Sequence, residues 1–339
     1  MKIFYQIYLD YTLFIFFTLS LFFTIIFFKF LIPLFVNYKF LDKPNKRSNH
    51  IEPVALGGGL VVIPLIILIS YLTGYVWSFA NIFVFISLFF ISLVDDFKNI
   101  RALYRLIMHF FCIFIYVHFS LLENINFTLY FKESYLTIFM YFFLIVGITW
   151  FINAFNFMDG IDGITAIQII FLTCSLMFFN LFLNLDNNVL HYCVLGVILG
   201  FLFYNWHPAK IFLGDSGSIP LGFLMLFLLV EFSFSGYWIA VLILPMYYLL
   251  DTSITLFLRA CRNEKFWQPH SQHFYQKAVR NGQSHKQVCI KIILLSIGLF
   301  VFSFLSILEK NNFIFLILSF VWSIFFLFNF SKTKKAIRK

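Results

Sequence analysis

Long apolar segments recur along almost the whole chain, and they limit the folds that it can adopt. A helix that crosses a bilayer needs roughly 20 mostly apolar residues. The composition supports membrane insertion: 62% of the residues are hydrophobic, whereas a soluble domain is nearer half apolar. The sequence therefore predicts an all-α integral membrane protein, a polytopic bundle of about 10–11 transmembrane helices in a single domain, 1–339. The eleven candidate spans are 12–36, 58–74, 78–94, 106–122, 134–152, 164–184, 189–205, 217–232, 237–258, 288–308 and 313–330.

Basic residues are distributed unequally between the two sets of alternating loops. Twenty of the 24 lysines and arginines belong to one set and to the C-terminal tail, if Lys291 just inside the next span is counted with them. The positive-inside rule places this set in the cytoplasm, with the N-terminus outside and the C-terminus inside. Topology thus accounts for the net charge of +9, and no nucleic acid partner is expected. The loops of the basic set are 37–57, 95–105, 153–163, 206–216 and 259–287.

Five aspartates lie at predicted helix ends in these same cytoplasmic loops. Each could cap a helix, but capping does not require all five to lie on one side. Carboxylates that pack together repel one another, so a cation or a proton must relieve them. Mg²⁺ prefers carboxylate oxygens together with substrate phosphates. The sequence therefore predicts an active site in the cytoplasmic loops, containing Asp95, Asp96, Asp159, Asp162 and Asp215.

Glycines accompany these acids. Gly160 and Gly163 each follow an aspartate, and Gly214 and Gly217 lie on either side of Asp215 and Ser216 in "GDSGS". They could let a phosphate approach the backbone at a helix N-terminus, or they could simply end helices. The sequence leaves both readings open. "LGGGL" at 56–60 has no following GK[ST], so tight packing between a helix and a loop is expected there.

Histidines and basic side chains suit diphosphate recognition. His270 and His273 have i, i+3 spacing, which places them on one face if the segment is helical. Asp251 lies inside the ninth span about two turns before Arg259, and it is either a functional acid or the structural partner of a basic residue. Other groups in the cytoplasmic loops are Lys43, Lys46, Arg47, His50, Arg101 and Arg105. The remaining histidines are read as core or surface residues: His109, His118, His191, His207 and His285.

The polar loops carry five motifs. They are "DKPNKRSNH", "LVDDFKN", "NAFNFMDGIDG", "FLGDSGS" and "RNEKFWQPHSQHFYQ". Together these motifs resemble those of a bacterial family, the polyprenyl-phosphate N-acetylhexosamine-1-phosphate transferases. They occur in that family's order, and the resemblance covers essentially the whole chain. It is closest to the branch that initiates O-antigen or related glycan synthesis.

The resemblance implies a reaction and its participants. A sugar 1-phosphate would pass from a UDP-N-acetylhexosamine to undecaprenyl phosphate, with release of UMP. The cofactor would be Mg²⁺, with Mn²⁺ as the alternative. The enzyme would lie in the lipid bilayer of the bacterial inner membrane as a multi-pass protein, with a homodimer left open.

The resemblance also implies residue roles. Asp215 would be the metal ligand, and Asp95 and Asp96 would lie at the catalytic centre, Asp95 positioning the lipid phosphate or acting as a base. His270 and His273 would lie near the diphosphate and belong to the catalytic set. The implied substrate-binding residues are Asn153, Asn156, Asp159, Asp162, His50, Arg47, Gly214 and Ser218.

The chain departs from the family pattern at three places. "PVALGGG" replaces the common "PTPRGGG", Ser271 replaces an arginine, and Tyr275 and Gln276 replace further histidines. The consecutive histidines of the peptidoglycan branch are absent, so a phospho-MurNAc-pentapeptide transferase ranks as the alternative. A membrane transporter is the rival from another class, because broken helices and buried acids also mark transporters. A lipid-binding structural protein would leave the acids unexplained.

Overall fold

Helices make up most of the structure. The computed structural model describes residues 2–44, 52–98, 100–122, 135–185, 188–265, 268 and 270–332. Each predicted span coincides with helical structure, which confirms the all-α membrane fold. The helices are α1 (Lys2–Asn37), α2 (Gly58–Leu72), α3 (Phe79–Lys98), α4 (Ala102–Tyr116) with a π-helical extension η1 (Val117–Leu121), α7 (Tyr135–Phe157), α8 (Ile164–Phe182), α9 (Val189–Asn205), α10 (Asp215–Ser233), α11 (Trp238–Ile243), α12 (Met246–Cys261), α13 (Phe274–Arg280), α14 (His285–Leu308) and α15 (Ile314–Ser331).

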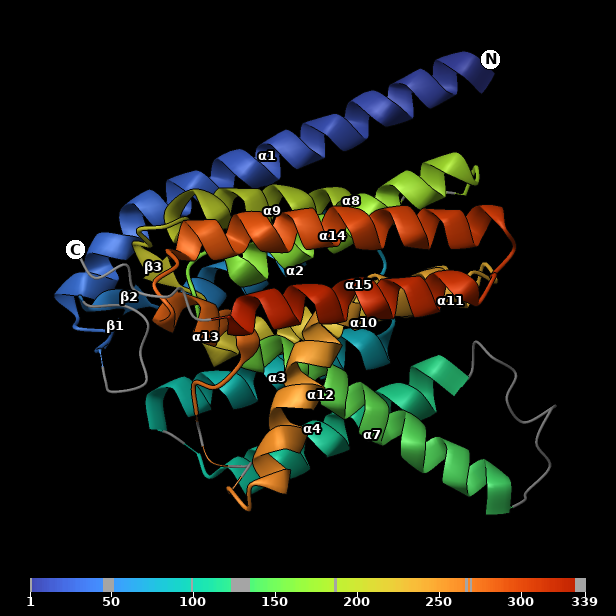
Figure 1. Cartoon of the computed structure of the whole chain (residues 1–339). Helices are drawn as coiled ribbons and strands as arrows, with labels where there is room; N and C mark the ends of the chain where they lie inside the picture. The colour runs from blue at the N-terminus through green and yellow to red at the C-terminus, as the bar shows by residue number, and fades with distance from the viewer. Residues whose placement is uncertain are drawn as a thin grey trace.

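The predicted spans differ in how completely they form. Within the described residues, eight helices are long and apolar enough to cross a bilayer. Helices α2 and α9 are shorter, with 15 and 17 residues. The prediction of one continuous span over 237–258 is wrong, because α11 ends before Pro245 and α12 begins after it. Proline lacks an amide hydrogen and interrupts a helix. Helix α12 then runs at a steep angle to α14 and α15 (Figure 1).

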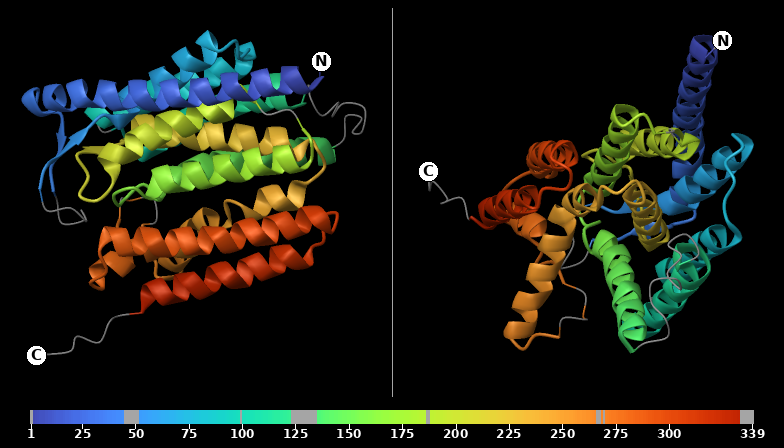
Figure 2. Two further views of the ribbon diagram at one scale, coloured as in Figure 1. Left: turned by 90° about the horizontal axis from the view of Figure 1, so that it is seen from above. Right: turned by 90° about the vertical axis from the view of Figure 1, so that its right-hand side faces the viewer.

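Helix α10 forms the centre of the bundle. It contacts α2, α3, α7, α8 and α11, and 83% of its most apolar stretch is buried, against 17% for α1. Helix α1 lies along α9 at the edge (Figure 2). Apolar side chains on α1 that face outward cost nothing if lipid surrounds them, because lipid tails are as apolar as leucine. The central position of α10 brings its first residue, Asp215, against several other helices.

The polar loops meet at one end of the bundle. A small sheet lies there, in the order β1 (Leu41–Asp42), β2 (Val54–Leu56) and β3 (Ile211–Phe212). β1 and β2 are antiparallel, whereas β2 and β3 are parallel, with Ala55 opposite Ile211. The sheet ties the first polar loop to the segment before α10. Figure 1 shows the sheet, α13 and the last turn of α15 at this end, and the start of α1 at the other. We call it the site end.

Close contact between α2 and α10 confirms the expected packing role of "LGGGL". The Gly59 amide donates to the Leu213 carbonyl at 2.8 Å. A Cβ at Gly59 would lie 2.4 Å from the Gly217 nitrogen, and a Cβ at Gly217 would lie 3.0 Å from the Gly59 Cα. Only glycine fits at such a distance, because the atoms that would have to move are backbone atoms.

Gly59→Ala is therefore expected to destabilise the protein by about 3 kcal/mol, at the upper end for an overpacked core. The measurement is the thermal unfolding midpoint in detergent. Gly147→Ala is the matched control, because a Cβ at this helical glycine meets nothing within 4 Å. Equal midpoints for the two variants would show that α2 and α10 do not pack this closely.

Candidate active site

Two aspartates share one guanidinium at the site end. Asp95 lies near the end of α3 and Asp215 begins α10. The Arg105 side chain, from the first turn of α4, donates through Nη1 to Asp95 Oδ2 and to Asp215 Oδ2, the latter at 2.6 Å. The Ile100 amide also donates to Asp95 Oδ1 at 2.6 Å. Two carboxylate oxygens thus converge on a single positively charged nitrogen.

Asp96 caps the N-terminus of α10. Its carboxylate oxygens accept hydrogen bonds from the amides of Asp215 at 2.9 Å and Ser216 at 3.0 Å. Gly214 permits this approach, because its φ is +77° and a Cβ there would lie 2.8 Å from Asp96 Oδ2. The next two amides donate to the Gly214 carbonyl. The first four amides of α10 therefore all have protein partners in the structure.

One of the two predicted asparagines, Asn156, links α7 to the same centre. Asn156 Oδ1 accepts a hydrogen bond from the Ser218 hydroxyl at 2.9 Å, joining α7 to α10. Asn153 lies one turn earlier, and its side-chain amide donates to the Thr149 carbonyl of its own helix at 2.8 Å. The structure thus brings Asn156 and Ser218 together, whereas Asn153 bonds within α7.

Asp159 lies in the turn between α7 and α8. Thr165 donates to its Oδ1 at 2.7 Å. Burial raises the pKa of Asp159 from 3.8 to about 6, and the nearby charge of Asp96 adds to the shift. A carboxyl group with this pKa takes up a proton more readily than an exposed aspartate does.

Asp159→Asn should alter how stability depends on pH. Between about pH 4 and about pH 6 the folded state holds a proton that the unfolded state has lost, so the wild type loses stability as pH rises. Asparagine does not titrate. The thermal midpoint of the variant relative to wild type should therefore increase through this window and stay constant above it. Parallel midpoint curves for the two proteins would contradict the raised pKa.

His270 and His273 lie beside the end of α7. Their rings stack with centroids 4.9 Å apart, and the His273 ring is 6.2 Å from that of Phe157. The i, i+3 spacing would place the two histidines on one face of a helix, but α13 begins only after His273. The expectation of a helix here is therefore wrong, although the two rings do contact each other. Burial, together with the charges of His273, Arg259 and Lys277, lowers the pKa of His270 to about 3. His270 is therefore neutral at pH 7 and can offer a hydrogen bond but no charge.

Asp251 holds this segment in place from α12. It is fully buried and accepts from the amides of Phe274 at 3.0 Å and Tyr275 at 3.3 Å. His273 Nδ1 lies 3.2 Å from Asp251 Oδ1. The acid thus caps α13, where a negative charge is favoured by the helix dipole. Its partners are this helix, His273 and the Thr255 hydroxyl. Arg259 bonds instead to Glu264 and to the Lys265 carbonyl.

Two of the residues that depart from the family pattern, Tyr275 and Gln276, also fix α13. The Tyr275 hydroxyl donates to the Phe157 carbonyl at 3.0 Å, and Gln276 Oε1 accepts from the His273 amide at 3.2 Å. Gly160 makes room for them, since a Cβ there would lie 2.2 Å from the Tyr275 hydroxyl. The motif "NFMDGIDG" is therefore the surface against which the histidine segment packs.

Asp162 belongs to a separate cluster with His207 and His285. The distances from Nδ1 to the carboxylate are 2.6 Å for His207 and 3.1 Å for His285. The Ala209 amide donates to the same carboxylate at 3.2 Å. Burial alone would raise the pKa of Asp162, but these hydrogen bonds outweigh it and lower the pKa below 3.8. The expectation that His207 and His285 are ordinary core or surface residues overlooked this cluster.

Two predicted substrate-binding residues, Arg47 and His50, lie outside the described residues. Arg105 is the main member of the site that the predicted set of site residues omitted. Its position ten residues after Asp95 was the available signal, but positive-inside topology explained the arginine equally well.

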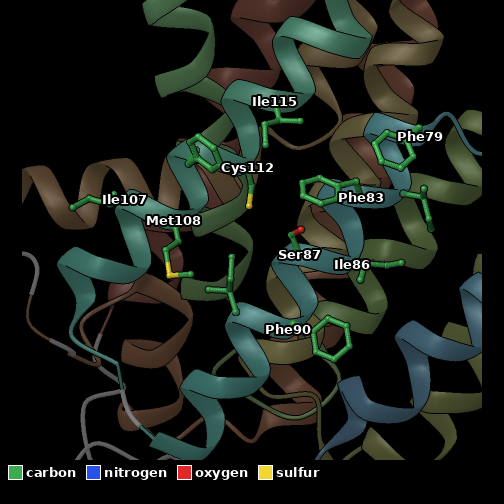
Figure 3. A pocket seen from close by; sticks show the side chains of 12 residues that line it. Phe79, Phe83, Ile86, Ser87, Phe90, Ile107, Met108, Cys112 and Ile115 are labelled. Carbon is green, nitrogen blue, oxygen red and sulfur yellow. The ribbon is translucent and has the colours of Figure 1, made fainter.

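An apolar groove leads toward the shared guanidinium. It lies between α3 and α4, has a volume of about 750 Å³, and is lined almost entirely by carbon (Figure 3). Its lining extends along α3 from Phe79 to Ile91, and along α4 from Ile115 to Ile107. Asp95 follows Ile91 by about one helical turn, and Arg105 precedes Ile107 by two residues. One end of the groove therefore lies beside the charged centre.

Comparison with known proteins gives consistent relatives. The family model for glycosyl transferase family 4 matches residues 78–233. A probable undecaprenyl-phosphate N-acetylglucosaminyl 1-phosphate transferase of Bacillus subtilis is 33% identical over 49% of this chain and 46% of its own, so the chain matches less than half of that protein. A phospho-N-acetylmuramoyl-pentapeptide-transferase of Kosmotoga olearia is 30% identical over 60% of this chain and 67% of its own. One from Wolbachia is 27% identical over 82% and 95%.

Proposed function

The chain belongs to glycosyl transferase family 4, and on that premise we propose that it is a sugar-1-phosphate transferase. It transfers the 1-phosphate of an N-acetylhexosamine, or of a deoxy or amino derivative, from a UDP-sugar to undecaprenyl phosphate. An oxygen of the lipid phosphate attacks the phosphorus that carries the sugar. The diphosphate bond breaks, and UMP leaves with the electron pair.

The observation that carries this proposal is the charged centre at the end of the apolar groove. A prenyl phosphate has a long apolar tail and an anionic head, so its acceptor site must join the two environments. The groove between α3 and α4 suits the tail. Arg105 suits the phosphate, because a guanidinium binds phosphate oxygens in a planar fork. A transporter would instead bind its substrate near the middle of the bilayer.

The two carboxylates beside Arg105 fit a divalent cation. Asp95 and Asp215 each turn an oxygen to the same nitrogen, and hard oxygen donors are what Mg²⁺ and Mn²⁺ prefer. We propose that these two residues hold Mg²⁺. The bound ion would neutralise diphosphate oxygens and ease the departure of UMP. Asp96 supports the arrangement by fixing the start of α10, which carries Asp215.

The remaining predicted residues are proposed to position the nucleotide. His270 is neutral, so it would donate a hydrogen bond to the diphosphate, and Asp251 orients the segment through His273. Asn156 and Asp159 would border the nucleotide on α7 and the following turn. We propose that the site faces the cytoplasm of a bacterial inner membrane, in line with the positive-inside distribution of basic residues.

A second candidate is the peptidoglycan reaction, in which the donor is UDP-MurNAc-pentapeptide. The names and coverage of the Kosmotoga and Wolbachia relatives favour it. The O-antigen-type branch is favoured instead by the single, separated histidines of "HSQHFYQ". The two candidates share the acceptor and the chemistry, and they differ in the donor.

The test is to incubate the purified full-length protein with undecaprenyl phosphate and each UDP-sugar in turn, with Mg²⁺, and to identify lipid products by mass. UDP-N-acetylhexosamines and UDP-MurNAc-pentapeptide are compared. We expect a lipid diphosphate sugar and an equal amount of UMP with one donor class. Accumulation of an unchanged UDP-sugar inside vesicles, without any lipid product, would overturn the proposal in favour of transport.

A further inference from the structure

We propose that Asp162, His207 and His285 form a second metal site, for a divalent transition metal such as Zn²⁺. The ligand atoms of the three residues lie within 4.8 Å of one another. Two imidazole nitrogens and one carboxylate oxygen are a donor set that suits zinc, iron or nickel. The hard oxygen pair of Asp95 and Asp215 selects a different kind of ion, so this cluster is separate from the proposed magnesium site.

The geometry of the cluster fits one shared ion. Zinc bonds of about 2.0–2.2 Å with tetrahedral angles place neighbouring ligand atoms about 3.3 Å apart. The His285 Nδ1 to Asp162 Oδ1 distance is 3.1 Å, and the two imidazole centroids are 4.9 Å apart. His207 Nδ1 lies 2.6 Å from Asp162 Oδ2, and its side chain, 41% exposed, has room to move outward to the ligand spacing.

The hydrogen bonding of His285 also favours an ion. The Asp162 amide points to His285 Nδ1 at 3.4 Å, which requires a lone pair on that nitrogen. The Asp162 carboxylate lies 3.1 Å from the same atom, which requires a proton there. One nitrogen cannot satisfy both at once. A metal held by that lone pair and by the carboxylate would replace the contact that needs a proton, and the Asp162 amide would lose only a contact that is long for a hydrogen bond.

The position of the cluster indicates what the metal would do. The three residues come from the turn before α8, the segment before β3 and the first residue of α14. The Cys289 thiol, one turn along α14, donates to the Asp162 carbonyl at 3.2 Å and further fixes the turn. A metal would cross-link three loops at the site end. His207 gives it access from solvent and leaves a position for water.

Metal titration of the intact protein tests this proposal. The purified full-length protein in detergent is stripped with a chelator and titrated with Co²⁺, then with Zn²⁺, in the presence of excess Mg²⁺ to occupy oxygen-only sites. We expect one Co²⁺ per chain with a visible absorption band typical of a tetrahedral site, its displacement by Zn²⁺, and a rise of at least about 2 °C in the thermal midpoint.

Three variants make the result decisive. His207→Ala removes a half-exposed ligand and should fold, yet it should lose the absorption band and the thermal shift. His285→Ala should do the same. His118→Ala changes an exposed histidine of η1 at the other end of α4 and should bind like the wild type. Absence of the band from the wild type, or an undiminished band in His207→Ala, would overturn the proposal. The readouts do not depend on transferase activity, so they stand apart from the proposed function.

Discussion

Asp215→Asn is expected to reduce sugar-phosphate transfer by about 100- to 1,000-fold, the loss seen when a group that stabilises transition-state charge is removed. The variant keeps one oxygen but loses the charge that Asp215 and Asp95 together present to one cation. The fold should remain, because the helix cap comes from the Asp96 carboxylate and not from the Asp215 side chain. The measurement is UMP release with the best UDP-sugar over a range of Mg²⁺ concentrations.

The dependence of activity on Mg²⁺ concentration shows whether Asp215 binds the metal or whether the substitution disturbs the site in some other way. If Asp215 holds the ion, the variant should need much more Mg²⁺, and Mg²⁺ should no longer raise its thermal midpoint. Glu309→Gln is the control, because Glu309 is exposed just beyond the end of α14, far from the site end. Wild-type activity with unchanged Mg²⁺ dependence in Asp215→Asn would refute the metal assignment.

Asp251→Ala is expected to destabilise the protein by about 3–5 kcal/mol, the cost of removing one partner from a buried charged network. Two backbone amides of α13 and the His273 ring would lose a common acceptor. The histidine segment would then lose its fixed position, so the KM for the UDP-sugar should rise together with the loss of stability. Thermal midpoints and steady-state kinetics measure the two effects.

Two companion variants show whether the cap is the cause. Asp251→Asn keeps one acceptor oxygen and should lose less stability than the alanine variant. Thr252→Ala alters the next buried residue of α12, whose hydroxyl has no hydrogen-bond partner among the described residues, and should cost little. A Thr252→Ala variant as unstable as Asp251→Ala would mean that α12 tolerates no change there, whatever the cap contributes.

The positions of the helices, and the location of the loop aspartates at one end of the bundle, could be predicted from the sequence because both depend on local properties. A long apolar segment becomes a helix in lipid whatever surrounds it, since only intrahelical hydrogen bonds satisfy its backbone. Each predicted span therefore coincides with a helix, and Pro245 divides one of them. Likewise, sequence order alone puts Asp95, Asp159 and Asp215 on one side of alternating spans.

Partnerships within the site could not be read in the same way. Arg105 and Asp215 are 110 residues apart, and Asp162 lies far from both of its histidines in the sequence. Apolar periodicity says little about how a helix is rotated when lipid and protein interior are equally apolar. Asp251 shows the consequence: its position in a span marked it as important, but its role as the cap of α13 depends on the angle at which α12 leaves the bundle (Figure 1).

The sequence by itself determined that the chain is a helical membrane protein with the five aspartates of its polar loops and most of its basic residues on one face, because burial in lipid acts on each segment independently. Only the tertiary structure decided which of those groups meet. In the structure Arg105 bonds to both Asp95 and Asp215. Asp96 accepts hydrogen bonds from the first amides of α10, and Asp162 contacts two histidines. A buried charge must find a partner within about 4 Å, and distances that short are set only when whole helices pack.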